Sequence, residues 1–535
     1  MWNPVFGSLL RCVSAPLVGL VLQVALAQAA VSINLALDDP AYPLLEKLVS
    51  SNLTWSNALT IKPITRLYAA RLIAEATQQR QRELADTQRQ EPFLDQTLQY
   101  LARRFQKELQ QIGFFYQPQP SDDAFFVASL TEFKLDLIGA HNQFVHRDSS
   151  GFTSNLQGVF GLQSGFAYGN DFSMRLRSVS WATLWQHVAV YLEPELIGRS
   201  DPLLGDVFDV DLFTGYLKAS YANLELEFGR DALWWGPASQ GDLVLSNNAP
   251  PLELLKLSTP LPFRIPWMFQ ELGEWQVAYF VARLEHDRTI PHALVNGLRV
   301  TLQPTSYLRV GFTNVVQAYG EDGVSIAAQD FVPRLFVPSL DTTGRTVNGL
   351  VAYDVVLSLP FVRDLPWLQS VKFYWQRGND NVKDVRGALG GGNILGGVID
   401  GGRWDVRIEF AETRDADTAS TIWYNHPTYQ DGFAFRRFVL GHPMGGAAES
   451  LYGRMTYYLA PTTWLAADGR RDRYGLDLQA TPTIQWRFGL EASHEIMLQE
   501  RHLVLWGRAE YATLDTPVAA MRRAIVVQLS ARWRF

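Results

Sequence analysis

The last fourteen residues, 522–535, read "RRAIVVQLSARWRF" and alternate in polarity from residue 525 onward. The odd positions are apolar or aromatic: Ile525, Val527, Leu529, Ala531, Trp533 and Phe535. The even positions from 528 are polar or charged: Gln528, Ser530, Arg532 and Arg534. Because alternate side chains of a strand point to opposite faces, this segment predicts a strand with one apolar and one polar face.

The terminal phenylalanine resembles the recognition signal of bacterial outer-membrane barrels. We therefore interpret Trp533 and Phe535 as an assembly signal, and we expect the barrel-assembly machinery and outer-membrane lipid as partners. The aromatic content of 30 Phe, 20 Tyr and 16 Trp fits a barrel whose aromatic girdles meet the membrane interfaces. Composition alone leaves a large soluble β-protein open as the alternative.

The period of two extends from about residue 124 to the C-terminus. In "NGLRVTLQPTSYLRVGFT" (296–313), two alternating segments flank a turn at Pro304 to Ser306. The polar face of this hairpin, with Arg299 and Gln303, suits a hydrated lumen better than the core of a soluble protein. At roughly 20–25 residues per strand with its connection, the remaining residues predict about 16 to 20 strands. Short turns indicate the periplasmic side of such a barrel, and longer connections indicate the outside.

The N-terminus has the order of a secretory signal: Arg11, an apolar run from about Val13 to Ala27, and a small-x-small triplet at 27–29. We expect cleavage after residue 29 and export to the outer membrane of a Gram-negative bacterium. A retained anchor is the alternative, although the apolar run is short for a membrane span. Cys12 is the only cysteine, so the mature chain is expected to have no disulfide and no thiolate ligand.

From about Asp38 to Gly113 the spacing is helical. The pattern predicts a short helix from near Pro40, a second at 66–90 with Thr65 as its N-cap, and a third at 94–112. These helices are too polar to cross a bilayer, and we expect a small bundle in the periplasm or against the barrel mouth. The predicted organisation is a signal peptide at 1–29, a helical region at 30–118 and a transmembrane β-barrel at 119–535.

The motifs of enzymes are incomplete. In "HEIMLQERH" (494–502), Leu498 stands where a zinc-protease helix needs its second histidine. The stretch "GGGNILGG" (390–397) lacks the Lys and Ser/Thr of a phosphate loop and predicts a surface loop, while "DGRRDRYG" (468–475) predicts a charged hairpin tip. Without Arg11 the chain has 46 basic and 54 acidic residues, a net charge of −8 that disfavours nucleic acid as a partner. We expect no enzyme activity, no catalytic residue, no metal and no cofactor.

The segment "DALWWGPASQGDLVLSNNAPP" (231–251) is too polar and interrupted for a core strand, and too rich in tryptophan for a passive loop. Sugars offer hydroxyls to polar side chains and apolar C–H faces to aromatic rings. We predict that seven residues of this segment, counted from the arginine directly before it, contact glycan: Arg230, Asp231, Trp234, Trp235, Gln240, Asn247 and Asn248. Adjacent tryptophans of a strand point to opposite faces, so the alternative places at least one in the interfacial girdle. Whether the segment lies outside, inside or below the barrel stays open.

A second dense patch is "WYNHPTYQDGFAFRRFVLGHPMGGAAES" (423–450). Its candidate glycan-binding residues are Tyr424, Arg436, Arg437 and His442. Glycines permit unusual backbone conformations there, and the paired arginines could hold a carboxylate or sulfate. The alternative is a barrel strand with lumenal arginines, followed by a flexible loop.

Three stretches together resemble the capsule-assembly Wzi family of outer-membrane proteins: "FGRDALWWGPASQGDLVLSNNAPP", "HALVNGLRVTLQPTSYLRVGFTNVVQAYGEDG" and "GFAFRRFVLGHPMGG". The resemblance runs from about residue 38 to the C-terminus. It implies a large antiparallel barrel of about eighteen strands with a small N-terminal helical bundle. It also implies a lectin-like role, the binding and retention of capsular or exported surface polysaccharide. A channel or exporter for polysaccharide or small solutes is the alternative, and the state of the lumen and of oligomerisation stays open.

Overall fold

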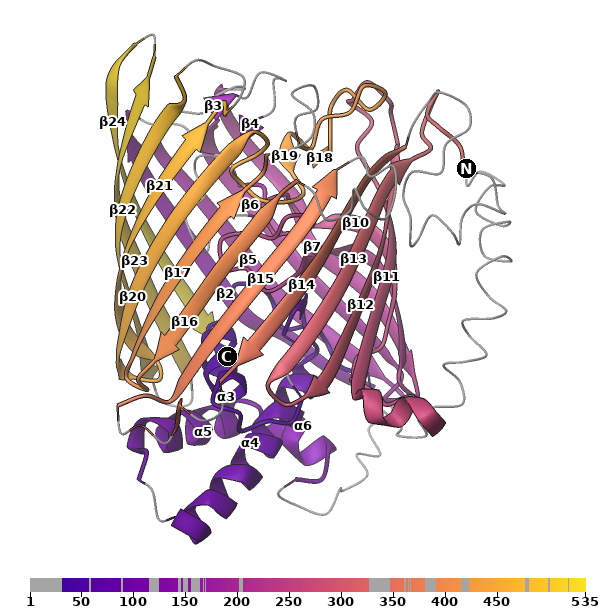
Figure 1. Ribbon diagram of the computed structural model, residues 1–535, viewed down its shortest axis with the longest axis vertical. Helices are drawn as coiled ribbons and strands as arrows, with labels where there is room; N and C mark the ends of the chain where they lie inside the picture. The colour runs from indigo at the N-terminus through magenta and orange to yellow at the C-terminus, as the bar shows by residue number, and fades with distance from the viewer. Residues whose placement is uncertain are drawn as a thin grey trace.

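Eighteen antiparallel strands form one closed barrel in the computed structural model of the protein (Figure 1). The strands follow one another around the barrel in sequence order, and β2 (Phe125–His141) closes it by pairing with β24 (Ala519–Arg534). The strands between them are β5 (Asp171–Leu184), β6 (Val188–Asp201), β7 (Gly205–Tyr221), β8 (Leu224–Asp231), β10 (Leu252–Ser258), β11 (Glu274–Arg283), β12 (Leu294–Thr305), β13 (Leu308–Ala318), β14 (Asn348–Ser358), β15 (Ser370–Asp380), β16 (Asn393–Asp400), β17 (Trp404–Glu412), β20 (Ala448–Ala460), β21 (Thr463–Tyr474), β22 (Thr483–Leu498) and β23 (Arg501–Thr516). The predicted fold class is confirmed, and the strand number lies within the predicted range.

The structure describes residues 31–535 apart from 57–58, 88–89, 115–124, 143–145, 148–152, 155–163, 167, 169, 202–204, 327–346, 360–361, 364, 366, 381–390, 415–422, 477–480, 499–500 and 518. The predicted signal peptide lies outside the described residues, as do the predicted domain boundaries at residues 29 and 118.

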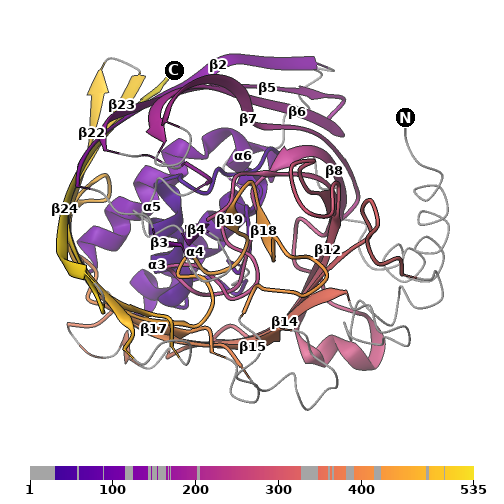
Figure 2. The same cartoon turned by 90° about the horizontal axis from the view of Figure 1, so that it is seen from above.

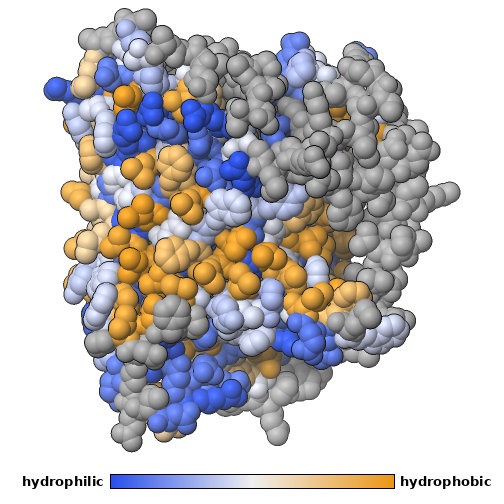
Figure 3. All heavy atoms as spheres, in the orientation of Figure 1, coloured by the Kyte–Doolittle hydropathy of each residue, from blue (hydrophilic) through white to orange (hydrophobic). Residues whose placement is uncertain are grey.

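The two faces of the strands differ as the alternation predicts. In β24, Leu529 points outward with 57% of its surface exposed, whereas its neighbour Gln528 is fully buried on the lumen side. Outward apolar side chains of neighbouring strands merge into the hydrophobic band visible in Figure 3. Such a band suits contact with lipid, which offers no hydrogen-bond partner to polar groups.

The predicted hairpin at 296–313 is confirmed as part of β12 and β13. Its polar face points into the lumen, but the lumen is packed there rather than hydrated. Arg299 is fully buried, and its guanidinium donates to Asp354 at 2.5 Å and to Thr313 at 2.7 Å. The short turn between β12 and β13 lies at the same end of the barrel as the helices (Figure 1). We call this the turn end, and the opposite end, where the longer connections lie, the loop end.

The N-terminal region lies at the turn end and partly inside the ring of strands (Figures 1 and 2). Its helices are α3 (Ala41–Ser50), α4 (Arg66–Thr87), α5 (Pro92–Arg104) and α6 (Gln106–Gln111). The hydroxyl of Thr65 accepts a hydrogen bond from the Tyr68 amide at 3.1 Å, which confirms the predicted N-cap. The third predicted helix is divided at Phe105, whose fully buried ring packs against the guanidinium groups of Arg66 and Arg104. No helix in the described part of the chain is both long and apolar enough to cross a membrane.

Several short elements are not part of the closed barrel sheet: β1 (Ile61–Lys62), β3 (His146–Arg147), β4 (Thr153–Ser154), β9 (Trp234–Trp235), β18 (Ala434–Phe435), β19 (Phe438–Val439) and the 3-10 helix η1 (Trp267–Leu272). Two expectations for loops were wrong. Residues 393–397 belong to β16, where a side chain at position 396 would overlap the ring of Tyr374. Residues 468–474 belong to β21, where Arg470 and Asp472 are buried and form an ion pair at 2.7 Å. In both stretches the partner strands, which local composition does not reveal, decide the conformation.

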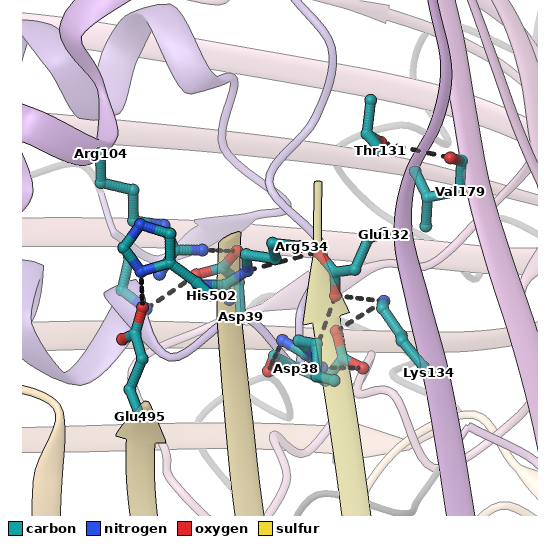
Figure 4. A network of polar contacts seen from close by, with 12 residues as sticks. Asp38, Asp39, Arg104, Thr131, Glu132, Lys134, Val179, Glu495, His502 and Arg534 are labelled. Carbon is teal, nitrogen blue, oxygen red and sulfur yellow. Dashed lines mark hydrogen bonds and ion pairs between the residues drawn. The ribbon is translucent and has the colours of Figure 1, made fainter. Parts of the chain in front are cut away.

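The N-terminal segment bridges the seam between the first and last barrel strands from inside (Figure 4). The Asp38 carboxylate accepts from Arg532 of β24 at 2.7 Å, from Arg177 of β5 at 3.1 Å and from Lys134 of β2 at 3.4 Å. Glu132 of β2 also pairs with Arg532, at 2.9 Å. Asp38 therefore joins three strands around the closure of the barrel.

We predict that Asp38→Asn weakens this seam. Burial alone would raise the pKa of Asp38, but Arg532, Lys134 and Arg177 outweigh it and hold the pKa well below its usual value. The carboxylate therefore stabilises the fold above pH ~4, and this contribution is lost as the pH falls through the lower folded-state pKa. At pH 7 we expect a loss of about 1–3 kcal/mol, seen as a lower temperature for loss of the folded band in detergent gels.

The matched control is Asp287→Asn, because Asp287 is almost fully exposed on the β11–β12 connection. It should leave the transition unchanged. Equal transitions for the wild type and Asp38→Asn at pH 7 would contradict a seam held by this carboxylate.

Candidate functional site

The tryptophan segment lies inside the barrel, which answers the question that the sequence left open. From the end of β8 the chain turns into the lumen, where β9 pairs with β1 of the N-terminal region. Trp234 is opposite Lys62 and Trp235 is opposite Ile61. The Gly236 amide donates to the Thr60 carbonyl at 2.9 Å, so the extension of β8 is joined directly to the N-terminal region.

Neither tryptophan belongs to an interfacial girdle. Trp235 is fully buried and meets the ring of Phe280 edge-on at 5.1 Å, while Trp234 is 8% exposed. Gly236 has a φ of 145°, and a side chain there would overlap the Asp242 carboxylate. The motif thus turns the backbone inside the lumen, where the alternation of faces along a barrel strand no longer applies.

A second segment from the loop end also folds inward, between β17 and β20. Figure 2 shows β18 and β19 of this segment inside the ring of strands. Trp423, Tyr424 and Phe433 are buried in the same apolar cluster as Trp235. We refer to 232–251 and 423–447 as the two inward loops. The alternative of a barrel strand with lumenal arginines was wrong, because Arg436 and Arg437 lie in the turn between β18 and β19.

Polar contacts join the two inward loops to each other. The Tyr424 hydroxyl donates to the Leu243 carbonyl at 2.7 Å and accepts from the His442 amide at 2.9 Å. The side chain of Asn248 donates to the Val439 carbonyl at 2.8 Å, and Ser246 Oγ donates to the Gly441 carbonyl at 2.6 Å. Because these side chains satisfy buried backbone carbonyls, they hold the loops in the lumen.

Barrel residues that sequence reasoning missed anchor the first inward loop. The Glu409 carboxylate of β17 accepts from the Ser239 amide at 2.7 Å, the Gln240 amide at 3.0 Å and the Tyr374 hydroxyl at 2.6 Å. Gln376 of β15 accepts from the Leu243 amide at 3.0 Å. The alternation "WDVRIEFAE" marks Glu409 as a lumen residue, but no local signal identifies its partners.

The predicted glycan-binding residues fall into an interior and a rim group. The interior group is Asp231, Trp234, Trp235, Gln240, Asn248, Tyr424 and His442, all buried, and Asn247 is partly buried beside them. Asp231 accepts from the Asn34 side chain at 2.7 Å, which ties β8 to the N-terminal segment. Burial lowers the pKa of His442 to about 3, so this imidazole is neutral. Glycan contact by these residues stays a prediction, while their described contacts are structural.

The rim group is formed by three arginines at the loop end: Arg230, Arg436 and Arg437. Arg230 pairs with Asp211 at 2.9 Å and with Glu253 at 3.1 Å. Arg436 pairs with the other oxygen of Asp211 at 3.1 Å, yet 45% of its side chain remains exposed. Arg436 and Arg437 are the two central residues of the β18–β19 turn, and their φ angles are 48° and 74°.

A cavity of about 360 Å³ lies in the lumen between the inward loops and the N-terminal region. It is lined by Ser164 and Asn247 near the loop end and by Pro461 and Trp464 near the turn end. Trp234 and many charged side chains line it between these limits. Among the described residues, no group of three or more His, Cys, Asp or Glu side chains is placed to hold a metal ion.

The chain is similar to a known protein family. The model of the capsule assembly protein Wzi family matches residues 139–512, more than two thirds of the chain. The chain is 25% identical over 273 residues to an uncharacterized 55.8 kDa protein in the cps region of Klebsiella pneumoniae, covering 50% of this chain and 52% of that relative. The match therefore spans about half the length of the relative.

A solved structure extends the likeness to nearly the whole chain. It is Wzi of Escherichia coli, an outer membrane protein involved in group 1 capsule assembly and described as a carbohydrate-binding β-barrel. The two folds superpose with a TM-score of 0.66 at 17% identity, over 94% of this chain and 100% of Wzi. At this identity the likeness concerns the fold. With the match of the family model, the chain belongs to the capsule assembly protein Wzi family.

Proposed function

We propose that this protein binds capsular or exported polysaccharide and retains it at the surface of a Gram-negative cell. The observation that carries the proposal is the arginine pair at the β18–β19 turn. Two-residue turns with positive φ at both positions favour Asn and Gly, and a left-handed conformation costs other residues about 1–2 kcal/mol each. Such strain is commonly retained where it serves a function. Here it holds Arg436 partly exposed at the loop end.

An exposed arginine suits a polymer with carboxylate, sulfate or hydroxyl groups. A single surface contact of this kind is weak. A repeating polysaccharide presents the same group many times, so that weak contacts at many sites multiply into retention. The carbohydrate binding described for Wzi of Escherichia coli favours the same role. The net charge of −7 provides no general attraction for an acidic polymer, so local arginines must supply it.

Further parts of the proposal concern export and assembly. We propose that residues 1–29 are a signal peptide, 30–118 a helical region and 119–535 the barrel, with Trp533 and Phe535 as the assembly signal. The rings of Trp533 and Phe535 stack at 6.2 Å, and Phe535 is 52% exposed. That exposure leaves the terminal ring accessible to assembly machinery, and the apolar band suits outer-membrane lipid. The absence of enzyme activity is part of the same proposal.

The alternative of a channel or exporter requires a lumen that opens. The two inward loops occupy the lumen from the loop end, and the N-terminal region occupies it from the turn end. We therefore expect no steady ion conductance when the purified protein is inserted into planar lipid bilayers. Replacing residues 237–244 by a short Gly-Ser linker should raise the conductance, because this removes the Ser239, Gln240 and Leu243 anchors. Steady conductance of the wild type would favour the channel.

Retention is tested by measuring cell-bound and released polysaccharide in strains with and without the gene. We expect deletion to leave the total unchanged and to move polymer into the medium. Complementation with the double variant Arg436→Ala, Arg437→Ala should restore only part of the retained fraction, a loss of about twofold or more. Arg403→Ala is the control, because Arg403 is an exposed arginine at the turn end. A fall in total export would instead support the exporter.

A further inference from the structure

Four cations surround the carboxylate of Glu46 in one part of the cavity wall. The cations are Lys62, Arg309, Lys372 and Arg407. Glu46 is already engaged twice: one oxygen pairs with Lys372, and the other accepts from Arg407 at 2.8 Å. The pKa of Glu46 lies well below its usual value, because Arg407 and Lys372 outweigh the effect of burial. Asp405, which lies two residues from Arg407 on β17 and also pairs with Lys47 at 3.1 Å, is another acid nearby.

Among these four cations, the lack of a paired acid is most evident for Lys62. Its ammonium lies over the rings of Trp234 at 5.4 Å and Tyr42 at 5.5 Å. It makes no hydrogen bond or ion pair with any residue that the structure describes. Burial lowers the pKa of Lys62, and Lys372 and Arg407 lower it further, while Glu46 and Asp242 act in the opposite direction.

Asp242 supplies little of the missing negative charge. Burial raises the pKa of its carboxyl group well above the usual value, which favours the neutral form. One of its oxygens accepts from the Ala238 amide at 3.1 Å. Lys62 is partly buried and faces the cavity without a matched anion, which is an unfavourable arrangement for a cation with reduced access to water.

The rest of the charged cavity wall is paired, which makes the excess local. Lys47 lies between Asp400 at 2.9 Å and Asp405 at 3.1 Å. Arg454 pairs with Glu491 at 2.6 Å. The seam network around Asp38 neutralises the basic side chains on the wall formed by β2, β5 and β24. The positive excess is thus confined to the neighbourhood of Lys62.

Features beside Lys62 point to a polar organic ligand rather than to a bare ion. Trp234, whose ring lies under the Lys62 ammonium, lines the cavity, and Asn247 lines it further toward the loop end. Trp234 and Tyr42 also present aromatic rings to the cavity. The cavity volume of about 360 Å³ falls within the range of roughly 300–1,000 Å³ found for small-molecule sites.

We propose that this part of the lumen cavity is a subsite for an acidic sugar unit, a uronate or a sugar with a comparable carboxylate. The carboxylate would pair with Lys62, and a C–H face of the sugar would lie against the ring of Trp234 or Tyr42. The assignment rests on the proposed polysaccharide role and specifies the class of sugar.

The test uses the full-length protein in detergent and measures binding by calorimetry. The probes are trigalacturonate, neutral maltotriose and sodium sulfate. We expect trigalacturonate to bind, maltotriose to bind at least about tenfold more weakly, and Lys62→Met to lose about tenfold in trigalacturonate affinity. Lys62→Arg, which keeps the charge, should retain most of that affinity.

Lys107→Met is the matched control, because Lys107 is exposed on α6 and remote from the cavity lining. It should bind trigalacturonate like the wild type. Retention of the folded band in detergent gels verifies that each variant keeps the barrel. Equal trigalacturonate affinity of Lys62→Met and the wild type would overturn the subsite. Sulfate binding that matches trigalacturonate and depends equally on Lys62 would also overturn it, since the site would then bind any anion.

The outcomes separate this inference from the retention role. Retention that depends on the gene, with no Lys62-dependent binding of trigalacturonate, would refute the subsite and leave the retention role in place. Lys62-dependent binding in a protein whose deletion leaves polysaccharide on the cell would refute retention and leave the subsite.

Discussion

The hydrocarbon layer contains no water, so every backbone N–H and C=O of a membrane-spanning strand must find its partner within the protein. For strands this requires closure, and here closure depends on the pairing of β2 with β24. A barrel of eighteen strands is too wide for its own inward side chains to fill. The interior is instead occupied by the N-terminal region from one end and by the two inward loops from the other. The arrangement of the lumen thus follows from the size of the closed barrel.

The two occupants of the lumen depend on each other and on the wall. They meet in the short pairing of β1 with β9, and Asn34 of the N-terminal segment binds Asp231 at the end of β8. The wall contributes carboxylates that accept from loop amides, as Glu409 does, and basic side chains that pair with acids of the N-terminal segment, as Arg532 does with Asp38. Polar side chains on the lumen face therefore anchor the chain segments that fill the lumen.

The sequence predicts those parts of the structure that depend on local periodicity. Alternation identifies the two faces of β24 and the β12–β13 hairpin, and the helical spacing with Thr65 identifies the start of α4. Local pattern was misleading at 393–397 and 468–474, because glycine-rich or charged stretches can be strands when neighbouring strands pair with them. It also could not show that the tryptophan segment turns inward, since Trp235 pairs with Ile61, a residue far away in the sequence. The composition of the sequence identified the candidate residues. Only contacts between distant parts of the chain show which of them are buried structural residues and which remain exposed.

The difference between buried structural residues and exposed residues limits which positions can determine specificity for a glycan. Trp235, Asn248 and Tyr424 are committed to packing or to buried backbone carbonyls. Substitution there would disturb the inward loops before it altered a sugar contact. A change in specificity is better tolerated at groups whose polar atoms are not required by the scaffold. Arg436 at the rim and Lys62 in the cavity meet this condition. Arg436 remains partly exposed, and Lys62 makes no hydrogen bond or ion pair with the described residues. Under the proposed role, changes at a few such positions would adapt the same scaffold to different polysaccharides.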